Sequence, residues 1–246
     1  MMEISVLASG SNGNCCLIED KDDSILIDAG KSCREIEKRM KRLGKSPEQL
    51  AAILISHSHA DHIAGAGVIS RKYKIPMYVT KQTYNEILYI GRQEIRHFFP
   101  GKEFQVGQLN VMPIQLCHDV ASCGFVINNF GIFTDTGKAT KQLMEAMPKL
   151  KGVLIESNHD IEMLIKGPYP QHLKYRILGD FGHLSNIHAS QLVKDKGKNL
   201  HLCLLGHLSA TNNTADLCRH TFETIVQRKV DYSVLSRECE SGSWEI

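Results

Sequence analysis

The densest group of potential metal ligands in the chain is the segment 57–62, which reads HSHADH and follows a short apolar stretch. Side chains alternate along an extended chain, so His57 and His59 are expected to point the same way and to grip one metal ion together. Asp61 and His62 come after the bend and can face a second ion. Imidazole suits zinc, and carboxylate also accepts manganese or iron. The segment therefore predicts a two-metal site.

Four residues are too few to close two metal sites, so the rest of the chain must supply further ligands. Other polar residues of the right type also follow short apolar runs that are expected to be strands. In α/β proteins the ends of such strands meet at one edge of a sheet, so these residues are expected to gather near the segment 57–62. They are Asp28, His118, Asp135 and His207.

Length and composition place the chain among ordinary globular proteins. It has 246 residues, of which 42% are hydrophobic and 23% charged, with a formal net charge of +2. That charge by itself does not indicate nucleic-acid binding. No basic leader precedes an apolar run at the N-terminus, and no apolar stretch approaches the ~18 residues that span a bilayer. We therefore expect a cytoplasmic protein with no membrane partner and, despite eight cysteines, no disulfide framework.

The pattern of apolar residues predicts one domain, residues 1–246, of the layered α/β class with two sheets between helices. The first half is rich in strands, and the second half alternates strands and helices. Strands are expected at 3–8, 16–19, 24–27, 51–55, 77–80, 104–106, 109–116, 123–128, 131–134, 152–156, 200–205 and 232–238. Helices are expected at 32–43, 63–73, 82–90, 140–147, 160–165, 171–178, 185–194 and 214–229.

The order and spacing of the candidate ligands resemble the ligand set of the metallo-β-lactamase fold superfamily over essentially the whole chain. This resemblance implies a four-layer αβ/βα sandwich in which two mixed sheets are flanked by helices. It implies two divalent metal ions, zinc first, with manganese or iron as alternatives. It also implies that Asp28 orients a ligand histidine from outside the metal site. The implied ligands are His57, His59 and His118 at the first ion, Asp61, His62 and His207 at the second, and Asp135 bridging both.

Four local sequences narrow the resemblance to one branch of that superfamily. They are ASGSNGNC at 8–15, ESNHD at 156–160, GHLSN at 182–186 and GHLSATNN at 206–213. Together they resemble the YycJ-like, or WalJ-like, branch, whose members are regarded as DNA exonucleases. The resemblance implies a dinuclear-metal phosphodiesterase that uses a metal-bridging hydroxide as nucleophile, with DNA as its partner. RNA is less expected, because the interval from Asp135 to His207 is too short for the inserted domain of RNA-processing relatives. No obligate protein partner is evident.

Several residues are expected to contact the substrate. Ser11, Asn12, Gly13 and Asn14 form a turn whose residue types tolerate positive φ, and such a turn can aim backbone N–H groups at an anion. A plain hairpin turn is the alternative. Two more candidates, Asn158 and His159, follow the expected strand 152–156 at the presumed active edge.

His183 is the expected proton donor, and Asp61 the second residue expected to be catalytic. His183 lies just before Ser185, which is a good N-cap for a helix, and a phosphate also binds well at a helix N-terminus. An imidazole there can protonate a leaving group or bind a phosphate oxygen. The alternative is a histidine whose hydrogen bonds are satisfied locally. The basic stretch 31–45 could hold a DNA strand or form a solvated helix face.

Two other functions remain open at the level of sequence. The same metal pair could serve a small-molecule hydrolase that acts on a cyclic phosphodiester, a thioester or a lactone. A narrow closed pocket would favour a small-molecule hydrolase, whereas an open groove with basic rims would favour an enzyme that acts on DNA. A non-catalytic metal-binding module is the third hypothesis, although a full ligand set with an open arrangement argues for catalysis.

Overall fold

The computed structural model describes residues 1–91 and 93–246, which divide into two compact units. Unit 1 comprises Met1–Pro113 and Ser236–Ile246, and unit 2 comprises Ile114–Leu235. The single domain expected from the sequence stays a prediction. Within the described ranges, none of the helices is both long enough and apolar enough to cross a bilayer.

The strands form two mixed sheets, as expected from the sequence, and each sheet has seven strands. The first has the order β14-β1-β2-β3-β4-β5-β6, and the second β13-β12-β11-β10-β9-β8-β7. The bounds in the first sheet are β1 Met2–Ala8, β2 Cys15–Asp20, β3 Asp23–Ile27, β4 Ala52–Leu54, β5 Met77–Val79, β6 Ile95–His97 and β14 Ser243–Glu245. Those in the second are β7 Phe104–Val106, β8 Leu109–Gln115, β9 Cys123–Ile127, β10 Phe130–Phe133, β11 Gly152–Glu156, β12 Leu202–Gly206 and β13 Asp231–Val234.

Helices flank the sheets, and six of them begin at a Ser, Thr or Asp whose side chain accepts a hydrogen bond from a first-turn N–H group. Unit 1 contains α1 Cys33–Arg42, α2 Ala60–Ile63, α3 Ala66–Tyr73 and α4 Lys81–Glu86. Unit 2 contains α5 Lys141–Ala146, α6 Ile161–Lys166, α7 Gln171–Leu178, α8 Asn186–Lys196 and α9 Ala215–Val226. The capping residues are Ser32, Thr80, Thr140, Asp160, Ser185 and Thr214.

Parallel pairing brings strand ends together inside each unit. In unit 1, β3 pairs in parallel with β4, and β4 with β5. In unit 2, β10, β11, β12 and β13 pair in parallel one after another. Their carboxyl ends therefore share one edge of each sheet, where open α/β sheets place their ligands. Asp28 follows β3, Asp135 lies just past β10, and His207 follows β12.

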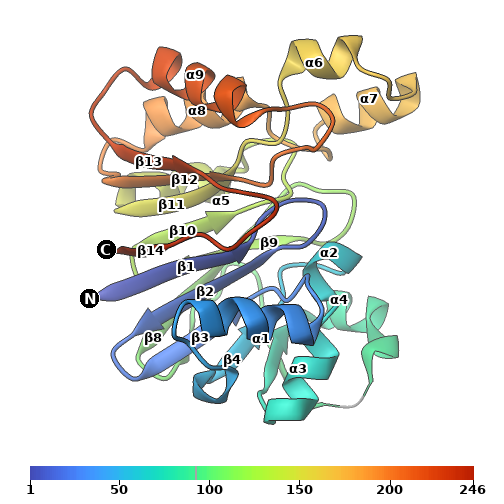
Figure 1. Cartoon of the computed structure of the whole chain (residues 1–246), viewed down its shortest axis with the longest axis vertical. Coiled ribbons are helices and arrows are strands. Elements are labelled where there is room, and N and C mark those ends of the chain that lie inside the picture. Colours follow the sequence, from blue (N-terminus) through green and yellow to red (C-terminus); the bar gives the residue numbers. More distant parts are fainter. Residues whose placement is uncertain (92) are drawn as a thin grey trace. The chain divides into compact units, whose positions relative to one another are not determined.

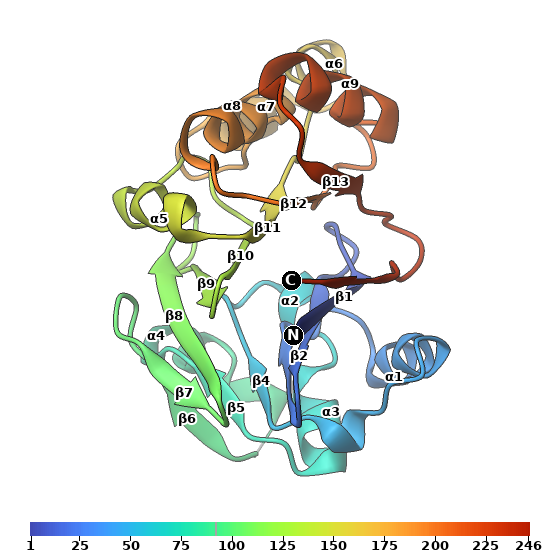
Figure 2. The same cartoon turned by 90° about the vertical axis from the view of Figure 1, so that its left-hand side faces the viewer.

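The apolar cores hold these edges in place. In unit 1, Ile36 of α1 and Ile69 of α3 pack with Leu17, Leu26 and Ile53 of the strands in one buried cluster. Figure 1 shows α1 and α3 beside β3 and β4. In unit 2 every residue of β11 and β12 is buried, as expected of central parallel strands. Figure 2 shows α8 and α9 over β12 and β13.

The one continuous helix expected over 63–73 is wrong, because the chain breaks between α2 and α3 at Gly65. A Cβ atom there would lie 2.1 Å from the carbonyl oxygen of Lys31, and the Gly65 N–H donates to Ala29 O instead. A close approach of two backbone segments thus overrides the helical pattern. Two short strands, β6 and β14, were not expected. The β1–β14 pairing brings the two chain termini side by side (Figure 1).

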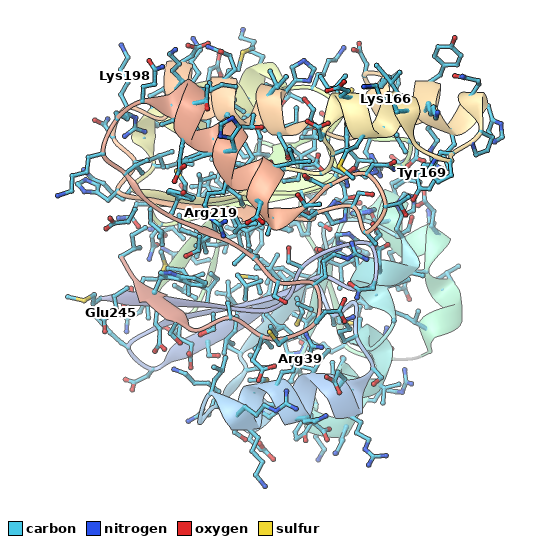
Figure 3. All side chains as sticks on the ribbon, turned by 45° about the horizontal axis from the view of Figure 1, so that its top comes forward. Arg39, Lys166, Tyr169, Lys198, Arg219 and Glu245 are labelled. Carbon is cyan, nitrogen blue, oxygen red and sulfur yellow. The ribbon has the colours of Figure 1, made fainter. Side chains whose placement is uncertain are left out.

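Arg39 ties three segments of unit 1 together. It lies on α1 and its guanidinium is buried (Figure 3). It donates to Leu7 O over 2.7 Å and to Glu238 O over 3.0 Å, and its Nε donates to Glu35 Oε1. One side chain thus connects the helix, the end of β1 and the C-terminal segment. The other basic residues of α1 carry the same charge, so the sequence does not show which of them has this structural role.

We expect Arg39→Met to lower the free energy of unfolding by about 2–6 kcal/mol, because two carbonyl groups would lose their donor at about 1–3 kcal/mol each. Urea unfolding followed by circular dichroism measures the change. Lys41→Met, an exposed position on the same helix, is the matched control and should stay within ~0.5 kcal/mol of the parent. An Arg39→Met midpoint equal to that of the control would contradict this role.

Candidate active site

Three of the residues singled out at strand ends adopt the left-handed backbone conformation. The φ angles are 59° at Asp28, 61° at Asp135 and 55° at His207. A side chain at such an angle costs of order 1–3 kcal/mol and persists only where the surroundings hold it. Strain of this kind gathers at functional sites, so the bends mark these three strand ends as places where the side chain must be aimed.

In unit 1, Asp28 is the centre of a buried hydrogen-bond network. Its Oδ1 accepts from the Ser56 N–H over 2.8 Å, and its Oδ2 accepts from the Ser56 hydroxyl over 2.8 Å. The same Oδ2 lies 2.7 Å from His62 Nδ1. A carboxylate can only accept, so His62 carries its ring proton on Nδ1. Asp28 thereby joins the ends of β3 and β4 and orients one imidazole of the HSHADH segment.

The same network sets the tautomer of His57, which is fully buried. The Ser56 hydroxyl already donates to Asp28, so its oxygen accepts from His57 Nδ1 over 2.9 Å. His57 and His62 therefore both hold the proton on Nδ1 and present the lone pair of Nε2. A neutral imidazole in this state, supported by a hydrogen bond from its other nitrogen, is the form that binds a metal ion.

The other two residues of the segment lie close to these histidines. Ligand atoms of His57 and His59 lie within 4.8 Å of each other, with ring centroids 4.7 Å apart. Asp61 Oδ2 lies 3.7 Å from His62 Nε2. His59 also stands at the N-cap of α2, which turns the chain between the two pairs. Unit 1 thus brings all four predicted ligands of the segment 57–62 together.

Asn14 is drawn into this group by its side-chain amide. Its Oδ1 accepts from the Gly10 N–H over 2.9 Å, which fixes the amide orientation. Its Nδ2 then donates to His62 Nε2 over 2.9 Å and to Asp61 Oδ2 over 3.3 Å. Of the four turn residues expected to contact substrate, Asn14 is thus the one whose side chain reaches predicted metal ligands.

The rest of the turn behaves largely as a hairpin. Ser11 and Asn12 are exposed at its tip. The N–H groups of Gly10, Gly13 and Asn14 all donate within unit 1, so they do not face an anion. Gly10 and Gly13 have φ of 133° and 139°, which suits glycine alone. An anion at this turn would be left with the N–H groups of Ser11 and Asn12.

Three basic residues of the stretch 31–45 make structural contacts within unit 1. Arg39 is buried as described above. Arg42 pairs with Glu240, and Lys45 contacts both Glu3 and Glu19. Arg42 and Lys45 thus contact carboxylates of unit 1, while Arg34, Lys38 and Lys41 are exposed, so a solvated helix face and a DNA-binding face both remain open for this stretch.

In unit 2, three histidines surround the carboxylate of Asp135. Its Oδ1 lies 3.9 Å from His118 Nε2, 3.5 Å from His207 Nε2 and 3.7 Å from His183 Nδ1. Asp135 and His207 are almost completely buried. The unit therefore gathers the three ligands that the sequence placed after separate strands, together with the expected proton donor.

Glu156 accepts hydrogen bonds from histidines in unit 2 as Asp28 does in unit 1, and it was not among the site residues predicted from the sequence. It has no exposed surface. Its Oε2 lies 3.1 Å from His183 Nδ1 and 3.2 Å from His207 Nδ1. Its Oε1 accepts from the N–H groups of Thr136 and Leu184. The signal was present, since Glu156 is the polar end of an otherwise apolar strand, the rule that selected Asp28.

The ionisation of Glu156 depends on its histidines. Burial opposes the charged form, but the charge of His183 and the hydrogen bonds from His183 and His207 outweigh it and hold the pKa of Glu156 at about 2. As an acceptor, the carboxylate fixes the ring protons of both histidines on Nδ1. His207 then presents Nε2 toward Asp135, and His183 presents Nε2 on its partly exposed side.

His118 follows the same rule. Its Nδ1 donates to Gly182 O over 3.1 Å, so Nε2 carries the lone pair. Burial is the largest influence on this ring and lowers the pKa of His118. In both units, therefore, the buried histidines that were predicted as ligands have Nδ1 directed to an acceptor, which leaves Nε2 as the nitrogen that could bind a metal.

Asn158 holds the bend at His207. Its Nδ2 donates to His207 O over 3.0 Å, and the N–H of the preceding Ser157 donates to Gly206 O. The side chain of Asn158 is only 5% exposed. This places Asn158 behind the strand end as a support for the left-handed residue, and its expected contact with substrate stays a prediction.

His159 is buried without a hydrogen bond to either ring nitrogen from any residue that the structure describes. It is 1% exposed, and burial lowers its pKa to about 4. A buried polar ring without partners is unusual in a native protein and calls for a role or a bound molecule. Its contact with substrate also stays a prediction.

Comparison with known proteins agrees with this geometry. Residues 8–154 match the model of the metallo-beta-lactamase superfamily. The chain is 36% identical to the exodeoxyribonuclease WalJ of Streptococcus pneumoniae, covering 88% of this chain and 85% of that one. It is 33% identical to the exodeoxyribonuclease YycJ of Bacillus anthracis, covering 93% and 90%. The metallo-beta-lactamase fold protein YhfI of Bacillus subtilis superposes with a TM-score of 0.77 at 17% identity, over the whole of both chains.

The fold and the grouped histidines and carboxylates define a metal-dependent hydrolase. The chain belongs to the metallo-β-lactamase superfamily, and it is similar over most of its length to the WalJ and YycJ exodeoxyribonucleases. The fold class and the superfamily expected from the sequence are thus confirmed.

The burial of His159 predicts a specific acid sensitivity. The unfolded chain protonates this ring near pH 6.5, whereas the folded state keeps it neutral down to about pH 4. Unfolding therefore takes up a proton in this interval, and the free energy of unfolding falls by up to ~1.4 kcal/mol per pH unit as the pH is lowered.

His159→Phe, which sacrifices no hydrogen bond to a described residue, should flatten this part of the pH profile. Urea unfolding between pH 7 and pH 4 measures the effect, with His172→Phe at an exposed position on α7 as the control. Unchanged acid sensitivity in His159→Phe would show that the buried ring is not the group responsible. A loss of activity with stability retained would support the substrate contact expected from the sequence.

Proposed function

We propose that this protein is a dinuclear-metal phosphodiesterase that degrades DNA from an end. The observation that carries the proposal is shared by four buried histidines that were predicted as ligands. His57, His62, His118 and His207 each direct Nδ1 to an acceptor within their own unit, which leaves Nε2 as the nitrogen for a metal ion. Such an arrangement suits metal binding and has no other evident purpose at the edge of a sheet. The choice of DNA is supported by the similarity to two exodeoxyribonucleases over most of both chains.

The metal ligands are proposed residue by residue, as family membership implies. Neutral imidazoles with a few carboxylates suit zinc first, and manganese or iron as alternatives. When bound, a pair of divalent ions lowers the pKa of a water molecule and neutralises charge on a phosphodiester. The proposed ligands are His57, His59 and His118 for one ion, Asp61, His62 and His207 for the other, and Asp135 for both. This assignment treats residues 1–246 as one functional domain.

Two carboxylates are proposed to orient the ligands from behind. Asp28 holds His62 directly and His57 through Ser56. Glu156 holds His207 and His183. Carboxylates in this position fix the ring orientation and raise the basicity of a ligand histidine. Asp61, 24% exposed, is proposed to act both as a ligand and as a catalytic carboxylate.

His183 is proposed to protonate the leaving oxygen. Its Nδ1 is fixed by Glu156, and its side chain is 18% exposed, so its Nε2 can reach a substrate. A positioned general acid contributes about 10²–10⁴-fold to rate. Substrate contacts by Asn14, Ser11, Asn12, Gly13, Asn158 and His159 complete the proposal. The cytoplasmic location stays a prediction.

We expect the purified, metal-loaded protein to shorten end-labelled linear DNA and to leave closed circular DNA intact. Chelation of the metal should abolish the activity, and zinc or manganese should restore it. Asp28→Asn should raise the metal concentration needed for half-maximal activity by about 10–100-fold, because a ligand histidine loses its anionic support. Titration of activity against buffered free metal measures this shift.

Asp22→Asn, at an exposed turn in the same unit, is the matched control and should need the same metal concentration as the parent. Failure to digest single- or double-stranded DNA with either metal would remove DNA as the substrate. Hydrolysis of a cyclic phosphodiester, thioester or lactone under the same conditions would then indicate a small-molecule hydrolase.

The role of His183 predicts a dependence on the leaving group. His183→Ala should lose about 10²–10⁴-fold in kcat on DNA, because the departing sugar oxygen needs a proton. On thymidine 5′-(p-nitrophenyl phosphate) the loss should be less than about tenfold, since nitrophenolate leaves without protonation. Steady-state rates on both substrates measure the contrast, with His172→Ala as the control. Equal losses on the two substrates would mean that His183 acts in another way.

A further inference from the structure

The turn between α7 and α8 in unit 2 displays a phenyl ring beside the expected proton donor. Phe181 lies two residues before His183, and it is 61% exposed. Tyr175 of α7 is also exposed. Single exposed apolar side chains are common on protein surfaces, so what distinguishes Phe181 is its place in the chain two residues before His183.

The turn is held firmly from several sides. The Gly182 N–H donates to Gly179 O, and the His183 N–H donates to Ile177 O. His118 donates to Gly182 O. The backbone at Gly137, just after Asp135, is so close that a Cβ there would lie 2.3 Å from Asp180 O. Phe181 therefore stands at a fixed position relative to the histidines of unit 2.

Two cationic side chains are connected to the turn by contact or by sequence. Lys138 pairs with Asp180, and Arg176 pairs with Asp119. The two cations are 52% and 55% exposed. Exposed ion pairs are weak, so either cation can exchange its carboxylate for another anion. The surroundings of the ring thus suit a ligand that combines a flat apolar face with phosphate charge.

We propose that Phe181 is a stacking platform for the terminal, unpaired nucleobase of a DNA strand, with Lys138 and Arg176 contacting its phosphates. The inference rests on the proposed function and specifies its substrate. Stacking of a base on an exposed aromatic ring strengthens binding and tolerates any sequence. A base unpaired from its complement exposes the face that Phe181 needs, so single-stranded or frayed ends are the preferred substrates.

Phe99, 62% exposed in unit 1, offers a control matched in residue type and exposure. We would compare Phe181→Ala, Phe181→Trp and Phe99→Ala on single-stranded oligonucleotides that end in a normal nucleotide or in an abasic one. Phe181→Ala should lose about tenfold in kcat/KM on the normal end and little on the abasic end. Phe181→Trp and Phe99→Ala should keep at least half of the parent activity on both.

A second readout separates binding from hydrolysis. The terminal base is replaced by 2-aminopurine, whose fluorescence falls when the base stacks, and the chelated protein is titrated onto the strand. The parent and Phe181→Trp should quench this fluorescence, whereas Phe181→Ala should not. Quenching without hydrolysis by metal-loaded parent protein would overturn the proposed function and leave the stacking role standing. Equal quenching by the parent and Phe181→Ala, or equal losses of activity on normal and abasic ends, would overturn the stacking role.

Discussion

Each unit depends on one buried carboxylate that accepts hydrogen bonds from both backbone and imidazole. Asp28 joins the ends of β3 and β4 in unit 1, and Glu156 joins the segments around β10, β11 and β12 in unit 2. A buried charge is costly unless donors surround it. Asp28 has three such donors, from Ser56 and His62, and Glu156 has four. The arrangement of donors therefore sets both the strand-end geometry and the histidine tautomers.

The left-handed residues follow from the same constraint. Asp135 and His207 could relax to ordinary backbone angles if nothing held the chain beyond them. The Thr136 N–H is fixed on Glu156, and His207 O is fixed by Asn158. The strained backbone at Asp135 and His207 is therefore held by hydrogen bonds that also fix the direction of their side chains. This couples stability to function, because a change that relaxes the bend also moves a proposed ligand.

The assignment as a metal-dependent hydrolase and the proposed digestion of DNA depend on different features of this protein. The first follows from donor atoms, tautomers and membership of the superfamily. The second depends on the surface that receives the substrate, and surfaces vary among proteins of one fold. Two basic residues of helix α1, Arg39 and Arg42, make structural contacts within unit 1. The exposed ring of Phe181, close to His183, is therefore a more specific candidate for substrate recognition than net charge.

The sequence alone determined the HSHADH segment, the candidate ligands at strand ends, the N-cap at Ser185 and the two-sheet class, because all of these depend on residue type and short-range spacing. Tertiary structure decided what lies far apart in the chain. Glu156 is separated from His207 by α6, α7, α8 and β12, and Asn14 is separated from His62 by β2, β3, α1 and β4, so no local pattern reveals either contact. The break at Gly65 likewise depends on a distant carbonyl. The order and register of the strands in the sheets determine which distant residues come into contact. The periodicity of apolar residues along the sequence does not specify that order.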